Sequence, residues 1–267
     1  MAIKILHPSL TADSRAVNDL KQEARIAMRL SHSHIVRLHN LDKHEKNYFL
    51  VMEYVPGRSL RAILQVVGKL SPETVKAIME VCGSALSFAH AQGVLHKDLK
   101  PDNMIVTEDG VLKIVDFSIS SFIGFKEDSD YVAGTPVYMS PEQMCGEPLD
   151  PRTDIYSLGI VAYELLTGLL PFPEDAKPED ILSRGYVPLD DLDPEYNETK
   201  EVLKKAVEFD RNKRWEKILE FTEAFAHAID SDTKKKASIS PRQRRVDYSN
   251  KPTARIRRQR TQTQESL

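Results

Sequence analysis

The chain has 267 residues, of which 41% are hydrophobic and 29% are charged, as is ordinary for a soluble globular protein with one large or two small cores. Its two cysteines, Cys82 and Cys145, show no CxxC or Cys/His spacing, so neither a disulfide framework nor a zinc site is expected. No apolar run approaches the roughly 18 to 20 residues that a membrane-spanning helix needs, and the N-terminus lacks the shape of a signal peptide. We therefore expect a cytoplasmic protein.

The formal net charge of −3 is unevenly divided along the chain. From residue 231 to 267, eleven Lys/Arg face three Asp/Glu, a net of +8, which leaves residues 1–230 at −11. The basic segment has almost no large apolar residue, so it cannot bury enough surface to offset its ordering entropy. We place the end of the folded domain near Asp230 and expect residues 231–267 to form a disordered basic tail. That tail could be a solvated linker, a contact for an anionic membrane or nucleic acid, or a phosphorylated docking segment.

The first elements are a strand, a helix and two further strands. Residues 1–6 alternate in polarity as a strand does, and residues 13–30 carry an apolar stripe at helical spacing. Strands are expected within 32–38 and 48–54, the second of which Pro56 and Gly57 end. From the residues alone, Lys4 on the first strand and Glu23 on the helix could both be solvent-facing charges. We read His32 and His34 as structural residues, because no third metal ligand is in view.

The middle and C-terminal parts are mainly helical. Ser71 and Pro72 begin a core helix that reaches about residue 92 and packs Cys82 inside. Short strands at 94–95, 104–106 and 111–115 follow, with a hairpin turn at 108–110. A nearly all-apolar helix from Asp154 to Gly168 belongs in a core, and further helices are expected near 178–184, 198–209 and 215–229.

The residues with the clearest chemistry lie at 96–103, in the run His-Lys-Asp-Leu-Lys-Pro-Asp-Asn. This set suits phosphoryl transfer: Asp98 can accept a hydroxyl proton, Lys100 can neutralise a transferring phosphoryl group, and Asn103 can bind a metal ion through its amide oxygen. The run closely resembles the H-R-D-L-x-x-x-N loop of eukaryotic-type protein kinases. Asp116-Phe117-Ser118, thirteen residues after Asn103, is similar to the D-F-G segment of that family, whose Asp binds Mg²⁺.

Other segments resemble the same family in the same order. Ala2-Ile3-Lys4 is similar to the end of the V-A-I-K strand, and residues 134–142 resemble the G-T-x-x-Y-M-A-P-E segment. The resemblance covers about residues 1–230 and looks most like the bacterial serine/threonine kinases. It implies an α+β, two-lobed fold, with a small β-rich lobe over residues 1–53 and a mainly helical lobe over 54–230.

The resemblance also implies a set of site residues. Mg-ATP would lie between the lobes, with Asp98, Lys100 and Asn103 as catalytic residues and with Asn103 and Asp116 as metal ligands. Lys4 would hold ATP phosphates and pair with Glu23; Asp154 would brace the 96–103 loop, and Arg214 would pair with Glu142. The full set implied to contact the nucleotide is Lys4, Glu23, Ala2, Met52, Glu53, Val55, Ile105 and Asp116, with Met52 at the gatekeeper position and 53–57 as the hinge.

The chain departs from the family pattern in three places. Lys97 replaces the Arg beside the catalytic Asp, Ser118 replaces the Gly after Phe117, and the chain starts inside the third strand, without the Gly-rich loop that covers the phosphates. Because Met1 stands where the family has Val, we expect the native protein to extend upstream of a misassigned start codon. Residues 119–140 resemble an activation loop, in which Ser129 is the first candidate for self-phosphorylation.

Two functions follow from these patterns. The first is a serine/threonine protein kinase that phosphorylates protein Ser/Thr hydroxyls, its own activation loop or tail among them. The second is a pseudokinase-like interaction module, which the missing lid, Lys97 and Ser118 favour.

Overall fold

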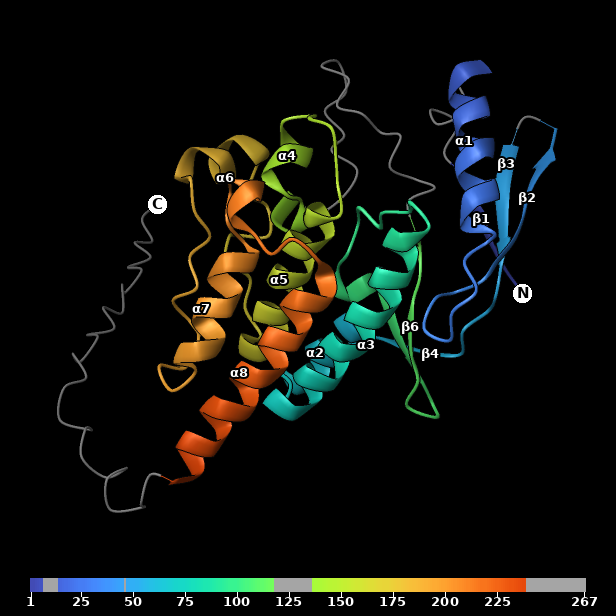
Figure 1. The fold of residues 1–267 in the computed structure, drawn as a ribbon. Helices are drawn as coiled ribbons and strands as arrows, with labels where there is room; N and C mark the ends of the chain where they lie inside the picture. Colours follow the sequence, from blue (N-terminus) through green and yellow to red (C-terminus); the bar gives the residue numbers. More distant parts are fainter. Residues whose placement is uncertain (7–13, 46, 118–135, 239–267) are drawn as a thin grey trace, which may run out of the picture.

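The computed structural model describes residues 1–6, 14–45, 47–117 and 136–238, and it has the α+β, two-lobed architecture that the sequence predicts (Figure 1). A three-stranded sheet and one helix form a small lobe, and the remaining helices form a larger one. The segment 118–135, with Ser118 and Ser129, lies outside the described residues, as does 239–267.

The small lobe is an antiparallel sheet of order β1-β3-β2, made of β1 (Ala2–Ile5), β2 (Leu38–His44) and β3 (Asn47–Met52). In its register Lys4 lies opposite Leu50. Helix α1 (Ser14–Ala27) covers the sheet, and its buried Leu20 and Ala24 share a core with Leu50. The strand expected within 32–38 is reduced to an isolated bridge at Ile35, and the regular strand starts only at Leu38.

A second antiparallel sheet, of order β4-β5-β6, joins the two lobes. Its strands are β4 (Gly57–Ser59), β5 (Met104–Thr107) and β6 (Leu112–Ile114). Gly110 turns the β5–β6 hairpin with a φ of 78°, a left-handed conformation that glycine adopts at little cost. The bridge from Ile35 to Ile114 connects this sheet to the small lobe. The strand expected at 94–95 is not among the strands of the described residues.

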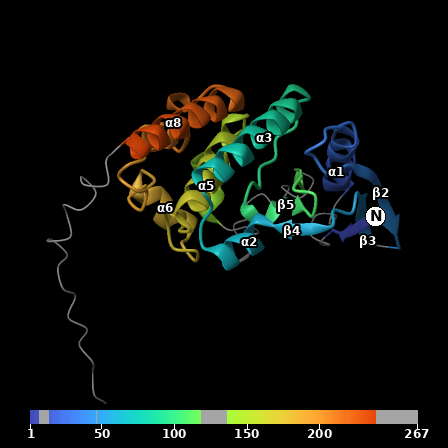
Figure 2. The ribbon, with the colours of Figure 1, turned by 90° about the horizontal axis from the view of Figure 1, so that it is seen from below.

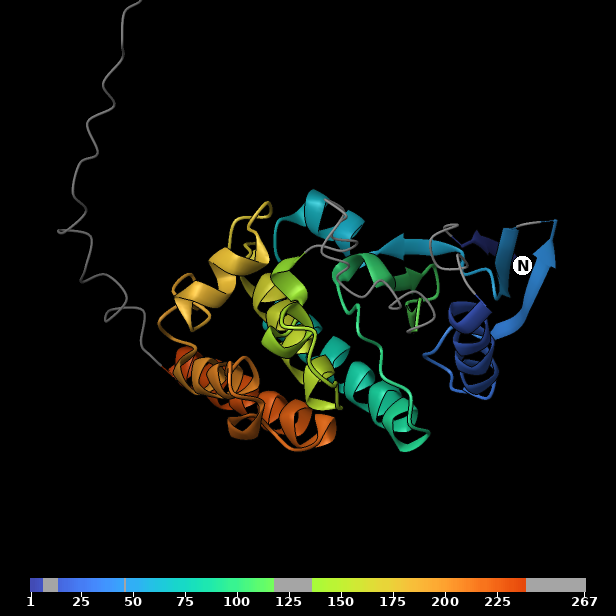
Figure 3. The same ribbon diagram turned by 90° about the horizontal axis from the view of Figure 1, so that it is seen from above.

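The large lobe is built around α3 (Pro72–Ala91) and α5 (Arg152–Thr167), with α8 (Ile218–Ser238) packed across them (Figures 2 and 3). Ser71 caps α3 by accepting the N–H of Thr74, and Cys82 is fully buried, as expected. Every residue from Thr153 to Leu166 is buried, which explains why that segment is apolar on all faces. The other helices are α2 (Leu60–Val67), α4 (Pro141–Met144), α6 (Pro178–Arg184) and α7 (Asn197–Ala206), with short 3₁₀ turns η2 (Pro101–Asn103), η3 (Pro136–Tyr138) and η4 (Arg211–Lys213).

Helices α2 and α5 approach each other closely at their C-terminal ends. Gly168 caps α5 at a φ of 76°, and a Cβ atom placed on it would lie 2.4 Å from the carbonyl oxygen of Gly68. The N–H of Leu70 donates to the carbonyl oxygen of Leu165 at 2.8 Å. The end of α2 can lie this close to the end of α5 because Gly168 has no side chain.

The predicted end of the folded domain near Asp230 falls within helix α8. Helix α8 continues to Ser238, and the buried Asp232 accepts the backbone N–H and the hydroxyl of Thr199 at the start of α7, both at 2.9 Å. Lys235 pairs with Glu198, and Lys236 pairs with Asp193 and Glu195. Lys235 and Lys236 were counted in the positive charge of residues 231–267. In the structure they form ion pairs with acidic side chains of the folded domain.

No helix within the described residues is both long enough and apolar enough to cross a membrane.

Candidate active site

The 96–103 loop brings together the three residues that its sequence singles out. Both carboxylate oxygens of Asp98 lie about 3 Å from Lys100 Nζ, at 3.0 and 2.9 Å. Asn103 Nδ2 donates to the backbone oxygen of Asp98 at 2.8 Å and to its Oδ2 at 2.9 Å. The Asp98 side chain is 38% exposed. The loop thus presents a partly open carboxylate that an ammonium group and a carboxamide hold in place.

Asp154, at the first turn of α5, anchors this loop from beneath, as the sequence implied. Its two oxygens accept the N–H groups of His96 and Lys97, each at 2.8 Å, and Oδ2 lies 2.7 Å from His90 Nε2. Burial alone would raise the pKa of Asp154, but the hydrogen bonds from His90 and from the backbone of His96 outweigh it and hold the pKa below its usual range. These bonds help to keep Lys97 at a φ of 66°, which costs about 1 kcal/mol or more for a non-glycine residue.

His96 is buried as a neutral imidazole. Its Nε2 lies 2.9 Å from the carbonyl oxygen of Val115, and its Nδ1 accepts the N–H of Asp98 at 3.3 Å. Burial lowers the pKa of His96, because no solvent reaches the charged form. One donating and one accepting nitrogen fit the neutral ring, whereas a proton on Nδ1 would face the N–H of Asp98.

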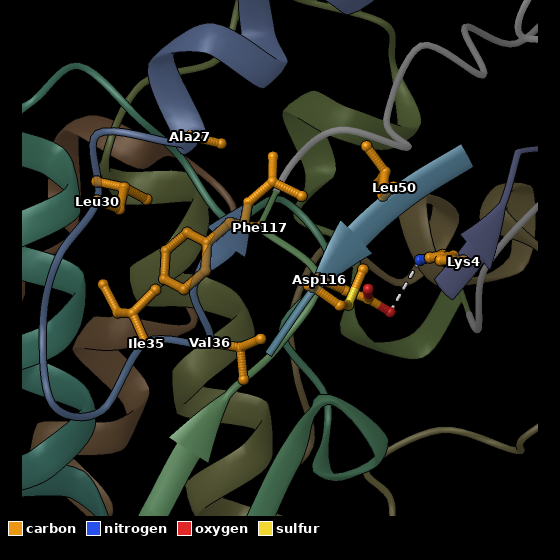
Figure 4. A pocket seen from close by; sticks show the side chains of 10 residues that line it. Lys4, Ala27, Leu30, Ile35, Val36, Leu50, Asp116 and Phe117 are labelled. Carbon is orange, nitrogen blue, oxygen red and sulfur yellow. Dashed lines mark ion pairs between the residues drawn. The ribbon is translucent and has the colours of Figure 1, made fainter. Parts of the chain in front are cut away.

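Asp116 and Phe117 connect the loop to the small lobe. Asp116 also has a left-handed backbone, with a φ of 64°, and its Oδ2 lies 2.9 Å from Lys4 Nζ. The ring of Phe117 stacks at a tilt on His96, with centroids 4.7 Å apart. Figure 4 shows Phe117 pointing between α1 and the 30–36 segment, while Asp116 turns toward Lys4.

The expected ion pair between Lys4 and Glu23 is not formed in this structure. Lys4 pairs with Asp116, and Glu23 Oε1 lies 3.7 Å from Lys97 Nζ. Lys4 and Glu23 line different pockets, and Glu23 shares its pocket with Lys97, which the sequence analysis considered only as a replacement for arginine. Because Lys97 lies within reach of α1, it offers Glu23 a second cation, while Asp116 neutralises Lys4.

Lys4 and Asp116 line a small, partly open pocket of about 30 Å³ (Figure 4). Met52 contributes to its wall, together with Leu50 and Leu38 of the sheet and Phe117. Apolar side chains form most of the lining. Met52, at the end of β3, therefore stands between this inner space and the segment that leaves the sheet.

The remaining residues expected to hold the nucleotide come from β1, β5 and the segment that follows β3. Ala2 is paired with Met52 across β1 and β3, and Ile105 is in β5, opposite Ser59. The backbone N–H of Glu53 donates to Arg37 O at 2.9 Å, and its side chain pairs with Lys113 at 2.8 Å. Val55 follows in the irregular segment between β3 and β4. Their joint contact with a nucleotide stays a prediction.

Asn103 and Asp116 carry oxygen donors that suit a hard divalent cation. Because Asn103 uses its amide nitrogen on Asp98, its Oδ1 remains for a ligand, and Asp116 supplies a carboxylate. No group of three His, Cys, Asp or Glu side chains that could hold a metal occurs in the part of the chain that the structure describes. Such a sparse donor set fits Mg²⁺, which usually binds one or two protein oxygens plus water and substrate phosphates.

Sequence reasoning missed a polar cluster beside the loop. Arg61 of α2 contacts Glu164 of α5, the hydroxyl of Tyr138 at 2.5 Å, and Asp102 at 3.3 Å. Tyr138 also donates to Glu164, and both side chains are buried. The sequence does carry a signal for α2, because Ser59 is a good N-cap and Leu60 and Leu64 share one helix face.

The expected pair between Glu142 and Arg214 is present and fully buried. The guanidinium group binds both carboxylate oxygens, at 2.7 and 2.8 Å, and Thr153 donates to the same carboxylate. Burial would raise the pKa of Glu142, but the hydrogen bonds and charge of Arg214 lower it. This pair ties the segment after the 118–135 stretch to the base of the large lobe.

Comparison with known proteins agrees with this geometry. Residues 1–229 match the family described as protein kinase domain. The chain is 37% identical over 177 residues to a probable serine/threonine-protein kinase of Clostridium acetobutylicum, which covers 66% of this chain and 27% of the relative. It is 34% identical over 192 residues to PknL of Mycobacterium tuberculosis, covering 71% and 47%, and 37% identical over 174 residues to PrkC of Bacillus subtilis, covering 64% and 27%.

The matched regions thus span only about a quarter to a half of these curated relatives. Within this chain, the family match runs from residue 1 to residue 229 and ends in the second half of α8. With the two-lobed fold, the 96–103 loop and the buried Glu142–Arg214 pair, the chain belongs to the protein kinase family.

Proposed function

We propose that the protein is a serine/threonine protein kinase, which transfers the γ-phosphoryl group of ATP to Ser or Thr hydroxyls of proteins. The observation that carries the proposal is the contact of Asp98 with both Lys100 and Asn103, on a loop that Asp154 fixes from below. The relatives named as serine/threonine-protein kinases support the same reaction.

In the proposed reaction, Asp98 orients the acceptor hydroxyl and accepts its proton. Lys100 lies beside that carboxylate and offsets negative charge on the phosphoryl group as it is transferred. Lys4, which pairs with Asp116, would hold the other phosphates through its ammonium group. Positioning and charge neutralisation supply most of the acceleration in this class of reaction.

ATP with Mg²⁺ is the proposed cofactor pair. Asn103, through Oδ1, and Asp116 would hold the metal, and the backbone of residues 53–55 with Ala2, Met52 and Ile105 would face the base. When bound, Mg²⁺ neutralises phosphate charge. In this proposal Lys4 exchanges some of its contact with Asp116 for phosphate oxygens, which a pair with partly exposed side chains permits.

Self-phosphorylation is proposed on Ser129 or on the tail. Ser129 lies outside the described residues, so its proximity to Asp98 remains a prediction. Contact of the tail with an anionic membrane or nucleic acid is the alternative to a plain linker. Because acidic partners already engage Lys235 and Lys236, any such contact would draw mainly on the eight Lys/Arg that follow Ser238.

The test is phosphate transfer from radiolabelled ATP by the purified chain, with Asp98→Asn as the control. Three matched peptides that differ only in a Ser, Thr or Tyr acceptor report the specificity. We expect transfer to Ser and Thr, and a fall of roughly 10²- to 10⁴-fold in Asp98→Asn, the usual contribution of a general base. Transfer no faster than in the control would refute the enzyme and leave an interaction module. Transfer to Tyr alone would refute the proposed specificity.

A further inference from the structure

The polar cluster around Arg61 connects four segments that are far apart in the sequence. The guanidinium group comes from α2, Glu164 from α5, Tyr138 from η3 and Asp102 from η2. Glu164 is nearly fully buried and interacts with both Arg61 and Tyr138. A single side chain thus bridges the helix after the lobe connection, the 96–103 loop and the turn that follows the 118–135 stretch.

The surroundings of Tyr138 and Arg61 favour one protonation state of each. Burial raises the pKa of the Tyr138 phenol, and the neighbouring Glu164 raises it further, so the hydroxyl stays protonated and donates to that carboxylate. Burial would lower the pKa of Arg61, but its bonds to Glu164 and Tyr138 raise it. The cluster is therefore held by charge-assisted hydrogen bonds, which are the stronger kind.

The turn that Arg61 contacts begins a segment that is hydrogen-bonded to the loop carrying Asp98. The segment 136–143 is attached to the 96–103 loop, because Gln143 Nε2 donates to the carbonyl oxygen of Lys97 at 2.8 Å. It is attached to α5 by Ser157, whose hydroxyl donates to the carbonyl oxygen of Tyr138 at 2.7 Å. A polypeptide that delivers a hydroxyl to Asp98 must cross the surface next to these residues.

We propose that Arg61 is a positioning residue for the polypeptide substrate. It holds the η3 turn and the Asp102 end of the loop in one arrangement, so that the acceptor segment meets an ordered surface beside Asp98. Arg61 does not touch the reacting atoms and acts through Tyr138 and Asp102. This inference rests on the proposed function, because it assumes that the acceptor is part of a polypeptide.

A single substitution of Arg61 would also leave Glu164 buried with one partner fewer, and the chain could fail to fold for that reason alone. The informative variant is therefore the double substitution Arg61→Met/Glu164→Gln. It removes both charges together and retains an amide that can accept the Tyr138 hydroxyl. Arg58→Met, on the neighbouring β4, is the matched control, because Arg58 is an exposed arginine three residues earlier.

Two readouts separate positioning from folding. One is the Kd of a Ser-containing peptide, measured by fluorescence anisotropy without ATP, so that no turnover is needed. The other is amide hydrogen exchange at Val137–Met139, where Met139 N–H bonds to Pro136 O. In the double variant we expect the Kd to rise about tenfold or more and exchange to accelerate similarly, with the Kd for ATP unchanged. Arg58→Met should match the wild type in all three.

Other results overturn the inference. Wild-type peptide affinity and exchange in the double variant would mean that Arg61 only compensates a buried charge. Faster exchange with unchanged peptide affinity would mean that the substrate does not use the η3 turn, and a wild type that binds no peptide would also refute the role. A wild type that binds peptide but transfers no phosphate refutes the proposed function alone.

Discussion

Replacing Asp154 by asparagine should destabilise the large lobe strongly, although the two side chains have the same shape. In the wild type, Oδ1 accepts the N–H of Lys97 and Oδ2 that of His96. An asparagine has one oxygen, so its NH₂ group must face one of these two backbone donors in either orientation. His90 can change its tautomer and offer a lone pair, so its contact contributes little to the loss.

The magnitude follows from these contacts. A hydrogen bond to a charged group contributes about 1.5–3 kcal/mol, and a buried N–H left without an acceptor costs about 1–3 kcal/mol more. We therefore expect a loss of about 3–5 kcal/mol in the free energy of unfolding. For a domain of this size that corresponds to a fall in Tm of roughly 10 °C.

The assay is thermal unfolding of the purified chain followed by circular dichroism. Asp175→Asn, which makes the same chemical change at an exposed position, is the control and should leave Tm within about 1 °C. If Asp154→Asn lowers Tm by less than about 2 °C, the two N–H bonds do not hold the loop. The explanation of the positive φ of Lys97 would then be wrong as well.

Two further predictions concern pH and the end of the domain. Because the folded pKa of His96 is depressed, protonation favours the unfolded chain, so stability should fall from pH 7 to 5 by up to about 1.4 kcal/mol per pH unit. Thermal melts of His96→Gln should show a flatter profile; an identical slope would contradict the assignment. Truncation after Ser238 should leave Tm unchanged, whereas truncation after Asp230 removes the Asp232 cap of α7 and should cost about 1–2 kcal/mol; equal Tm values would restore the earlier boundary.

The sequence predicted those site features whose residues carry a recognisable local pattern. The 96–103 loop is one short run, so its internal contacts among Asp98, Lys100 and Asn103 follow from the run itself. The Glu142–Arg214 pair was predicted only because both residues occupy positions of a known family, since nothing local connects them across the chain.

The sequence did not predict which of several charged residues a given side chain would pair with. Glu23 could pair with Lys4 or with Lys97, and only the placement of α1 decides for Lys97. The ion pair of Lys235 with Glu198 was likewise not predicted, because the two residues lie on different helices. The sequence analysis therefore counted Lys235 with the charge of the tail. Arg61 was missed for the same reason, as its three partners come from three other segments.

The position of Arg61 relative to Glu164 depends on the close approach of the backbone at Gly168 and Gly68. Gly168 lies one turn after Glu164 on α5, and a methyl group there would collide with the backbone of Gly68 at the end of α2. Any side chain at this glycine would push α2 outward and draw Arg61 away from Glu164. In a mutational screen for lost activity, Gly168 should therefore score like a residue of the substrate site, although it contributes no atom to the chemistry.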